Sequence, residues 1–352
     1  MQRLVQGNEA VFLGALRAGA SFYSGYPISP SSEIMAEAAK WSASHPEFNF
    51  IQTEDEIAAA MCVIGAALAG AKAFTATSGP GFSLMQESLG MAYMAEVPCV
   101  FVDVQRVGPS TGMPTMIAQS DLIQAQHGSH GDYYPIAFYP NSVAECFKLA
   151  VTAFNASEEA HQPVILLSDA HLGHLHELAD LEAIETEALP REVPPLGGHA
   201  RHFTGLISDE NGVPRTSDFQ VYRRWLAMVK ERSARVAAKY PLYEYRPNPK
   251  SDTLLISFGI VSRTVLSLAA QYGYFRPIRM LPVLKDELAA IASSYRNLVV
   301  VEANDGQYAS LVEQALKRDV LRAPVLGGKV SLAEITGWVA DLAGPSAAPS
   351  LA

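Results

Sequence analysis

The sequence has little charge, and this shortage excludes one class of protein. Charged residues make up 18% of the 352 residues, below the typical share of about 25%. Acidic residues outnumber basic ones by 36 to 26, so the net charge is −10. This excludes a nucleic-acid-binding protein, which needs basic side chains against the phosphate backbone. A chain of this size with so little charge must bury much of its surface, in a large core or against partner subunits.

Cysteine is also scarce. Cys62, Cys99 and Cys146 are separated by 37 and 47 residues, and no Cys-x-x-Cys pair occurs. This spacing excludes a zinc knuckle or a cysteine-ligated iron–sulfur cluster within the chain, and no histidine spacing suggests a metal site. The apolar neighbours of each cysteine predict buried free thiols in a reducing compartment.

Long apolar runs are missing as well. The longest, Ile57–Ala71, has 15 residues and contains two glycines, whereas a helix that crosses a bilayer needs about 20. The N-terminus has no apolar core of a signal peptide. The sequence therefore predicts a cytoplasmic protein that does not contact a membrane.

What is present is an alternation of helical and strand patterns. Up to about Leu172, continuous apolar strands such as Pro98–Val104 and Pro163–Ser168 alternate with helices. This pattern predicts a parallel sheet that is covered by helices on both faces. From Thr253 the alternation resumes, with a strand expected at Ile278–Leu281.

Between these regions the composition changes. The stretch 177–214 is acidic and then rich in proline and glycine, and Gln220–Tyr240 has the pattern of a basic amphipathic helix. We therefore predict an α/β domain at 1–185, a connector with one helix at 186–250, a second α/β domain at 251–343 and a tail at 344–352.

Three loops at predicted strand ends carry unusual residues, and ligands in parallel α/β folds bind on such loops. In the first, Gly25–Glu33, two interpretations of Ser29 are open. It can cap the next helix with Pro30 at the first position. Alternatively, its hydroxyl and the following amides face an anionic ligand.

The second loop places Glu54, Asp55 and Glu56 at the start of an apolar helix. Carboxylates in a first turn suit the helix dipole, which accounts for two of the three. The third must face the apolar side of the helix, where water is scarce. Burial there would raise the pKa of the carboxyl and make it useful as a proton relay.

The third loop begins with Arg106 at the end of a buried strand. A buried guanidinium needs an anion, and its planar fork suits a substrate carboxylate. The alternative is an intramolecular ion pair with Asp103 or Asp121. A further loop, Thr77–Gly81, is rich in glycine, but it lacks the spacing of a nucleotide-binding loop.

Together these loops make the sequence similar to the alpha subunits of thiamine-diphosphate-dependent 2-oxoacid:ferredoxin oxidoreductases, most of all the 2-oxoglutarate type. The matching strings, in chain order, are Tyr26-Pro-Ile-Ser-Pro-Ser-Ser32, Gln52-Thr-Glu-Asp-Glu56, Thr77-Ser-Gly-Pro-Gly81, Arg106-x-Gly-Pro-Ser-Thr-Gly-x-Pro-Thr115, Ser129-His-Gly-Asp132 and Val301-Glu302-Ala-Asn304-Asp-Gly306-Gln307. Ser29 departs from the family, which usually has threonine there; the hydroxyl is kept and a methyl group is lost.

The resemblance implies a fold and a set of site residues. The fold is a pyrimidine-type thiamine-diphosphate-binding domain followed by a domain like the C-terminal domain of transketolase. Glu56, with Glu54 as the alternative, would contact the cofactor aminopyrimidine. Substrate contacts would come from Arg106, Ser29, Tyr26, Pro27 and Ile28, and further cofactor contacts from Thr77, Ser78, Gly79 and Pro80.

The resemblance also implies partners, because the chain has no Gly-Asp-Gly magnesium motif. A beta subunit would carry the diphosphate and Mg²⁺ site and a [4Fe-4S] cluster, and gamma and ferredoxin-like delta subunits can follow. The reaction would convert a 2-oxoacid and coenzyme A into acyl-CoA and CO₂, with electrons passing to ferredoxin. Branched-chain 2-oxoacids or pyruvate are alternative substrates, and a non-catalytic scaffold subunit is an alternative role. We expect the chain to be inactive and poorly soluble alone.

Overall fold

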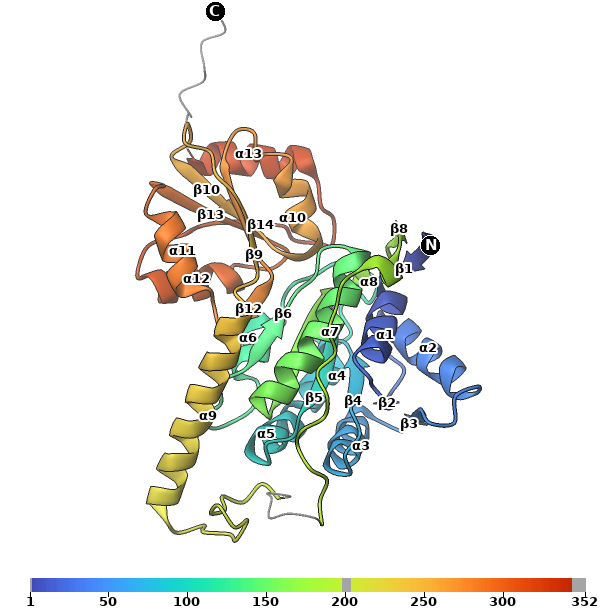
Figure 1. Cartoon of the computed structure of the whole chain (residues 1–352). Helices are drawn as coiled ribbons and strands as arrows, with labels where there is room; N and C mark the ends of the chain where they lie inside the picture. Colours follow the sequence, from blue (N-terminus) through green and yellow to red (C-terminus); the bar gives the residue numbers. More distant parts are fainter. Residues whose placement is uncertain (1, 198–203, 344–352) are drawn as a thin grey trace, which may run out of the picture.

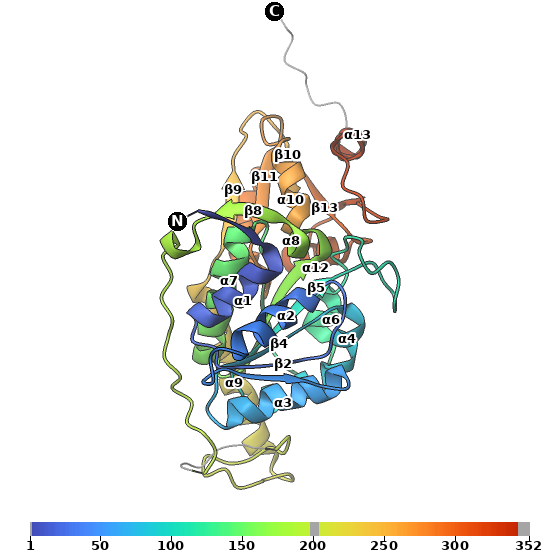
Figure 2. The ribbon, with the colours of Figure 1, turned by 90° about the vertical axis from the view of Figure 1, so that its right-hand side faces the viewer.

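The structure is a computed structural model and describes residues 2–197 and 204–343. It contains a seven-stranded sheet, a five-stranded sheet and a two-stranded ribbon (Figures 1 and 2). Part of the predicted connector, 198–203, and the predicted tail lie outside the described residues. Within the described residues, no helix has the length and apolarity that crossing a membrane requires.

The seven-stranded sheet has the strand order β12-β6-β7-β5-β4-β2-β3. All neighbouring strands are parallel except β12, which pairs antiparallel with β6. The strands are β2 (Phe22–Gly25), β3 (Asn49–Gln52), β4 (Ala73–Thr77), β5 (Cys99–Gln105), β6 (Ile136–Phe138), β7 (Pro163–Asp169) and β12 (Arg279–Leu281).

Helices cover both faces of this sheet, as the continuous apolar strands predict. In β5, Val100 and Val102 pack into one hydrophobic cluster, whereas Cys99 and Phe101 pack into the cluster on the opposite face. The first face carries α1 (Gly7–Arg17), α2 (Ser32–Ser42) and α7 (Val143–Ala160). The other face carries α3 (Glu56–Leu68), α4 (Gly79–Leu84), α5 (Gln86–Met94) and α6 (Leu122–His127). The predicted parallel α/β fold is confirmed.

The five-stranded sheet has the order β14-β13-β10-β11-β9, with β9 antiparallel at its edge. Its strands are β9 (Tyr243–Arg246), β10 (Thr253–Ile256), β11 (Gly273–Pro277), β13 (Asn297–Glu302) and β14 (Leu321–Pro324). Its helices are α10 (Gly259–Leu266), α11 (Lys285–Ala292), α12 (Gln307–Leu316) and α13 (Leu332–Ala343). This sheet too is covered on both faces.

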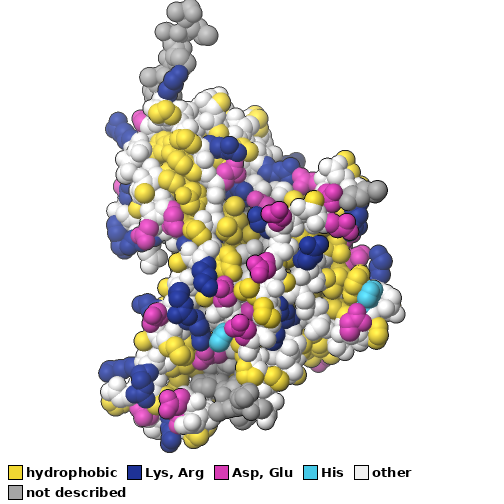
Figure 3. Space-filling view, viewed as in Figure 1, with side chains coloured by type: hydrophobic (Ala, Val, Ile, Leu, Met, Phe, Trp, Pro, Cys, Tyr) yellow, Lys and Arg dark blue, Asp and Glu magenta, His cyan; other side chains and the backbone are white. Residues whose placement is uncertain are grey.

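The remaining elements surround or join the two sheets. They are the ribbon of β1 (Arg3–Gln6) and β8 (His176–Ala179), the short helices α8 (Ala170–His174) and η1 (Leu181–Ala183), and α9 (Phe219–Lys239). The predicted amphipathic helix is confirmed in α9, which buries Val221, Trp225 and Val229 at helical spacing. Lys and Arg side chains are frequent over the lower left of the molecule, where α9 lies (Figure 3).

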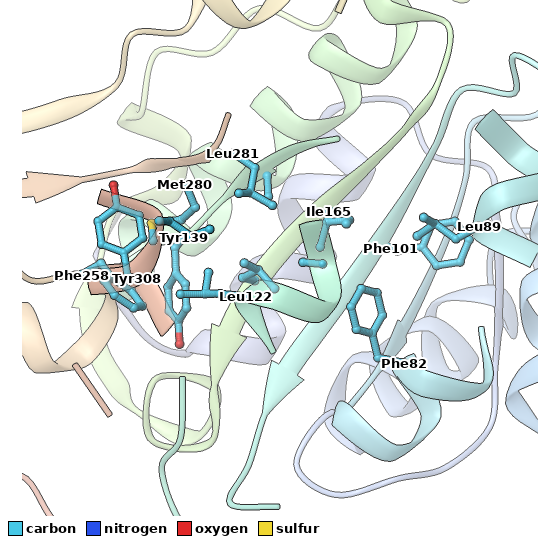
Figure 4. Close-up of a cluster of buried hydrophobic side chains, with 14 of the residues drawn as sticks. Phe82, Leu89, Phe101, Leu122, Tyr139, Ile165, Phe258, Met280, Leu281 and Tyr308 are labelled. Atoms are coloured by element: carbon cyan, nitrogen blue, oxygen red, sulfur yellow. The ribbon is translucent and has the colours of Figure 1, made fainter. Parts of the chain in front are cut away.

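The expected strand at Ile278–Leu281 lies in a different sheet from the one that the sequence order suggests. The chain leaves the five-stranded sheet after β11, and Arg279–Leu281 then pairs with β6 of the seven-stranded sheet. One hydrophobic cluster consequently runs through both sheets. In it Phe258 lies between Tyr139 and Tyr308, with ring centroids 5.3 Å apart in each pair (Figure 4). The two halves share a core and are not joined by a linker alone.

The sequence predicts that all three cysteines are buried, and the structure confirms this for two of them but not for Cys62. All three are free thiols, and Cys99 and Cys146 are buried whereas Cys62 is only partly so. Burial raises the pKa of the Cys99 thiol to about 12, so this thiol stays protonated and unreactive at neutral pH.

Candidate active site

Four adjacent parallel strands, β5, β4, β2 and β3, end at one edge of the seven-stranded sheet. The loops that follow them cover residues 106–121, 78, 26–31 and 53–55. Because the carboxyl ends of parallel strands share an edge, these loops lie together, and every residue predicted for the site lies in one of them or within two residues of one.

Glu56 is the first residue of α3, and local capping fixes its position. Asp55 is the N-cap residue, and its carboxylate accepts a hydrogen bond of 2.7 Å from the amide of Ala58. Asp55 therefore has a structural role. Glu54 is exposed, whereas Glu56 is only 6% exposed. Burial raises the pKa of Glu56, the charge of Asp55 raises it further, and that of Arg106 lowers it.

The carboxyl of Glu56 points at the turn between β4 and α4. A Cβ atom added to Gly81 would lie 2.5 Å from Glu56 Oε1 and 2.2 Å from Thr77 Oγ1. Only glycine leaves room there, so Glu56, Thr77 and Gly81 form one contact group. The predicted cofactor loop and the predicted catalytic carboxyl therefore meet.

Ser78, which directly follows β4, is fully buried, and its hydroxyl has no hydrogen-bond partner within the described residues. Its neighbours Gly79 and Pro80 begin α4. A buried hydroxyl without a partner costs about 1–3 kcal/mol. A ligand oxygen at this position would remove that cost.

Arg106 lies directly beyond β5 and is 8% exposed. One Nη atom donates a hydrogen bond of 2.6 Å to the backbone oxygen of Ser29, and Nε is buried without a partner. Within residues 2–197 and 204–343, no carboxylate oxygen lies within 4.0 Å of a nitrogen of this guanidinium, which is the limit for an ion pair. Burial lowers the pKa of Arg106, while the charges of Asp121 and Glu56 raise it.

The sequence left open an ion pair between Arg106 and Asp103 or Asp121. The structure contains no such pair within the described residues. Instead the two aspartates contact each other as a buried carboxyl pair. Burial and the charge of Asp121 raise the pKa of Asp103 well above its usual range. Burial also raises the pKa of Asp121 to about 6. The sequence did contain a signal for Asp103, because an ionisable residue within an apolar strand is unusual.

The loop after β2 presents mixed side chains. Tyr26, Pro27 and Ser29 are exposed, and Ile28 is partly buried. Helix α2 starts only at Ser32, after Ser31, whose hydroxyl donates to the backbone oxygen of Ile28 over 3.0 Å. The capping role considered for Ser29 is therefore wrong. Its hydroxyl is left for another contact, while its backbone oxygen holds Arg106.

In the described part of the chain, no group of three or more His, Cys, Asp or Glu side chains is arranged to hold a metal ion.

A parallel sheet covered on both faces, with a buried glutamate at its carboxyl edge and a second α/β unit packed against it, is consistent with a thiamine-diphosphate-binding protein. The chain belongs to the family described as pyruvate flavodoxin/ferredoxin oxidoreductase, thiamine diphosphate-binding, whose model matches residues 13–238. The predicted family is thereby confirmed.

Individual relatives agree with this assignment. The chain is 39% identical to the 2-oxoglutarate synthase subunit KorA of Methanothermobacter marburgensis, over 93% of this chain and 95% of the relative. It is 32% identical to the ketoisovalerate oxidoreductase subunit VorB of the same organism, over 98% and 99% of the two chains.

Among solved structures, the chain is similar to the 2-oxoglutarate:ferredoxin oxidoreductase of Magnetococcus marinus, described with 2-oxoglutarate, coenzyme A and succinyl-CoA bound. The TM-score is 0.89 at 29% identity, and the match covers 97% of this chain and 65% of the other. A split-gene transketolase matches with a TM-score of 0.59 at 12% identity, which shows a shared fold alone.

Proposed function

We propose that this chain is the alpha subunit of a 2-oxoacid:ferredoxin oxidoreductase that converts 2-oxoglutarate and coenzyme A into succinyl-CoA and CO₂, with ferredoxin as electron acceptor. The observation that carries this is a buried arginine without a carboxylate partner beside a buried glutamate, at the edge where the fold binds ligands. Relatives named for 2-oxoglutarate synthase support the choice of substrate.

The residues at this edge fit thiamine diphosphate. The unpartnered hydroxyl of Ser78 and the buried carboxyl of Glu56 are features that fit a polar cofactor ring, and glycine at position 81 leaves room for that carboxyl. When bound, the cofactor supplies the thiazolium carbon that attacks the keto group. Glu56 would hold a proton at N1′ of the aminopyrimidine, and its burial favours the protonated form that this exchange requires. The exposure of Glu54 supports Glu56 over the alternative.

Arg106 would bind the substrate carboxylate. Its guanidinium is anchored at one nitrogen by the backbone of Ser29 and has donors left for an anion. The Ser29 hydroxyl would contact the keto group, and Tyr26, Pro27 and Ile28 would form the neighbouring wall. Thr77, Ser78, Gly79 and Pro80 would border the cofactor.

The surface next to Glu56 suits a partner subunit. Ile57 and Met61, one turn apart on α3, are 47% and 39% exposed, and Leu84 at the end of α4 is 49% exposed. Such side chains are typical of an interface that is covered in an assembly. We propose that a beta subunit with the Mg²⁺ and diphosphate site and a [4Fe-4S] cluster covers them, and that gamma and delta subunits complete the enzyme. A cytoplasmic location remains a prediction.

The test compares the chain alone with its co-expressed complex. Calorimetry with thiamine diphosphate and Mg²⁺ should show binding by the complex and none by the chain. Micromolar binding by a monodisperse monomer would contradict the shared site. Turnover of the complex with 2-oxoglutarate, pyruvate and 2-oxoisovalerate then identifies the substrate, and no turnover with any of them would support a scaffold role.

A second substrate class has an observation in its favour. VorB, named as a ketoisovalerate oxidoreductase subunit, matches 98% of this chain. A turnover preference for 2-oxoisovalerate over 2-oxoglutarate would replace the proposed substrate and leave the site unchanged.

A further inference from the structure

The segment that leads from the Arg106 loop into α6 is held by the other half of the molecule. Gln119 exchanges two hydrogen bonds with Ala303, which follows β13: its amide donates to the Ala303 oxygen over 2.9 Å, and its side-chain oxygen accepts from the Ala303 amide over 2.8 Å. The side-chain nitrogen of Gln119 donates to the Phe258 oxygen over 2.9 Å. Asn304 Nδ2 donates to the Gln119 oxygen over 2.6 Å.

Gln307 extends these contacts into α6. Its side-chain nitrogen donates to the backbone oxygen of Ser120, and its side-chain oxygen accepts from the Ile123 amide over 3.1 Å. Asn304 Oδ1 accepts from the Gln307 amide over 2.8 Å, which ties the two side chains together. We call Gln119, Asn304 and Gln307 the clamp. Within the described residues, each of their side-chain polar atoms has a partner.

Asp121 lies at the end of the clamped segment. Its amide donates to Gln105 Oε1 over 2.8 Å, so the residue is held from β5 as well as from the clamp. Its carboxyl does not cap α6. It contacts Asp103, acts on Arg106 and lies 2.9 Å from where a Cβ of Gly79 would be.

The geometry limits the charge of this pair. Asp103 is fully buried, and within the described residues its oxygens have no partner besides Asp121. Two buried carboxylates in contact cannot both be ionised, so one proton is shared between them. The pair then carries a single negative charge beside Arg106. The charge of Asp121 raises the pKa of Arg106, so it attracts the guanidinium without forming the direct ion pair that would compete with a substrate anion.

We propose that Asp121 is a positioning residue for the Arg106 guanidinium, and that the second half of the chain sets its position through the clamp. This inference rests on the proposed role of Arg106 in binding the 2-oxoacid carboxylate. The sequence of Glu302–Gln307 resembles the family, but no role followed from that resemblance. The proposal gives this region a role in positioning Asp121.

The experiment measures KM and kcat for 2-oxoglutarate with the whole complex. Asp121→Asn keeps the size of the side chain and its contact with Asp103. It should raise KM about tenfold, while kcat and the affinity for thiamine diphosphate change less. Asp121→Ala, which also loses that contact, should raise KM further, so the conservative variant rescues part of the effect.

Gln119→Ala tests the clamp, and Gln162→Ala is its matched control. Gln162 is also buried, and its side-chain amide donates to a backbone oxygen, that of Tyr134, over 3.0 Å, away from the site. Both variants should lower Tm, but only Gln119→Ala should raise KM. The proposal is overturned by the following result: Gln119→Ala and Gln162→Ala lower Tm equally, and neither changes KM. In that result Asp121→Asn also leaves KM unchanged.

Arg106→Lys, measured in parallel, separates this failure from that of the proposed function. If Arg106→Lys leaves kcat/KM unchanged, the role of Arg106 is wrong. If Arg106→Lys lowers kcat/KM while the Asp121 and Gln119 variants do not, only the positioning role is overturned.

Discussion

The two sheets bury similar polar side chains at the carboxyl ends of their strands. The two sets differ in whether these side chains find hydrogen-bond or ion-pair partners within the protein. Ser257 follows β10 as Ser78 follows β4, but the Ser257 hydroxyl donates to the Val301 oxygen over 2.8 Å while that of Ser78 has no partner within the described residues. Arg276 in β11 binds both carboxylate oxygens of Glu145 at 2.8 Å, whereas Arg106 makes no such pair.

This difference distinguishes polar side chains that stabilise the fold from polar side chains that are proposed to bind a ligand. A buried polar group without a partner costs about 1–3 kcal/mol, so such a group at the ligand-binding edge of a parallel sheet is a candidate for contact with a ligand. At the five-stranded sheet, Ser257 and Arg276 both have protein partners, and the partner of Arg276 comes from α7 of the other half. At the seven-stranded sheet, Ser78 and Arg106 keep polar atoms without a partner within the described residues, which agrees with the proposed site shared with a cofactor and a second subunit.

The largest effect is expected for Glu56→Gln. The variant should assemble, yet lose on the order of 10²-fold or more in turnover, because it cannot exchange a proton with the cofactor. Turnover of the complex under saturating substrate measures this, with Glu54→Gln as the exposed neighbouring control. Near-normal turnover of Glu56→Gln would remove Glu56 from the mechanism.

Arg106→Lys and Arg276→Lys compare the unpaired arginine with the paired one. Lysine keeps the charge but loses the planar fork. Since a hydrogen bond to a charged group contributes about 1.5–3 kcal/mol, Arg106→Lys should lower kcat/KM about tenfold or more. Arg276→Lys should lower Tm and leave kcat/KM unchanged. Equal kinetic effects of the two variants would contradict the comparison.

Gly81→Ala and Gly337→Ala differ in the space that each glycine has. A Cβ at Gly81 would overlap Thr77 and Glu56, so alanine should destabilise the complex by about 1–3 kcal/mol and reduce activity. Gly337, exposed in α13, has nothing within 4 Å, and alanine there should stabilise by about 0.5–1 kcal/mol. Thermal unfolding and turnover of both variants decide the matter.

Ser257→Ala and Ser78→Ala test the two hydroxyls. The first removes a buried hydrogen bond and should cost about 1 kcal/mol of stability. The second removes a hydroxyl without a protein partner, so stability should not fall, while the affinity of the complex for thiamine diphosphate should. A loss of stability in Ser78→Ala without loss of cofactor affinity would contradict the assignment.

The smallest effect concerns pH, because Glu56 is one of 36 acidic residues. Its pKa is raised in the folded chain, so its contribution to stability is fully present below the unfolded pKa and is lost as pH rises through the folded one. In complex freed of thiamine diphosphate, Glu56→Gln should therefore gain in Tm relative to the wild type as pH rises. A constant Tm difference from pH 4.5 to 8 would contradict the raised pKa.

The helix start and the strand end that carry the candidate site residues follow from the sequence, because each signal is local. Asp55-Glu56 at a helix start and Arg106 beyond an apolar strand are recognisable from neighbouring residues alone. For Ser29 the sequence leaves two roles open, since capping depends on where α2 begins. The structure places that start at Ser32, two residues after Pro30, with Ser31 at the N-cap position.

Apolar periodicity by itself determined the two covered parallel sheets and the amphipathic helix α9, because burial on both faces fixes which residues a strand can contain. The tertiary structure alone decided which distant groups meet. It placed β12 in the first sheet, joined Asp103 to Asp121 instead of to Arg106, and brought Asn304 against Gln119. These contacts join residues that are far apart in the chain, and the sequence near either partner contains no information about the other.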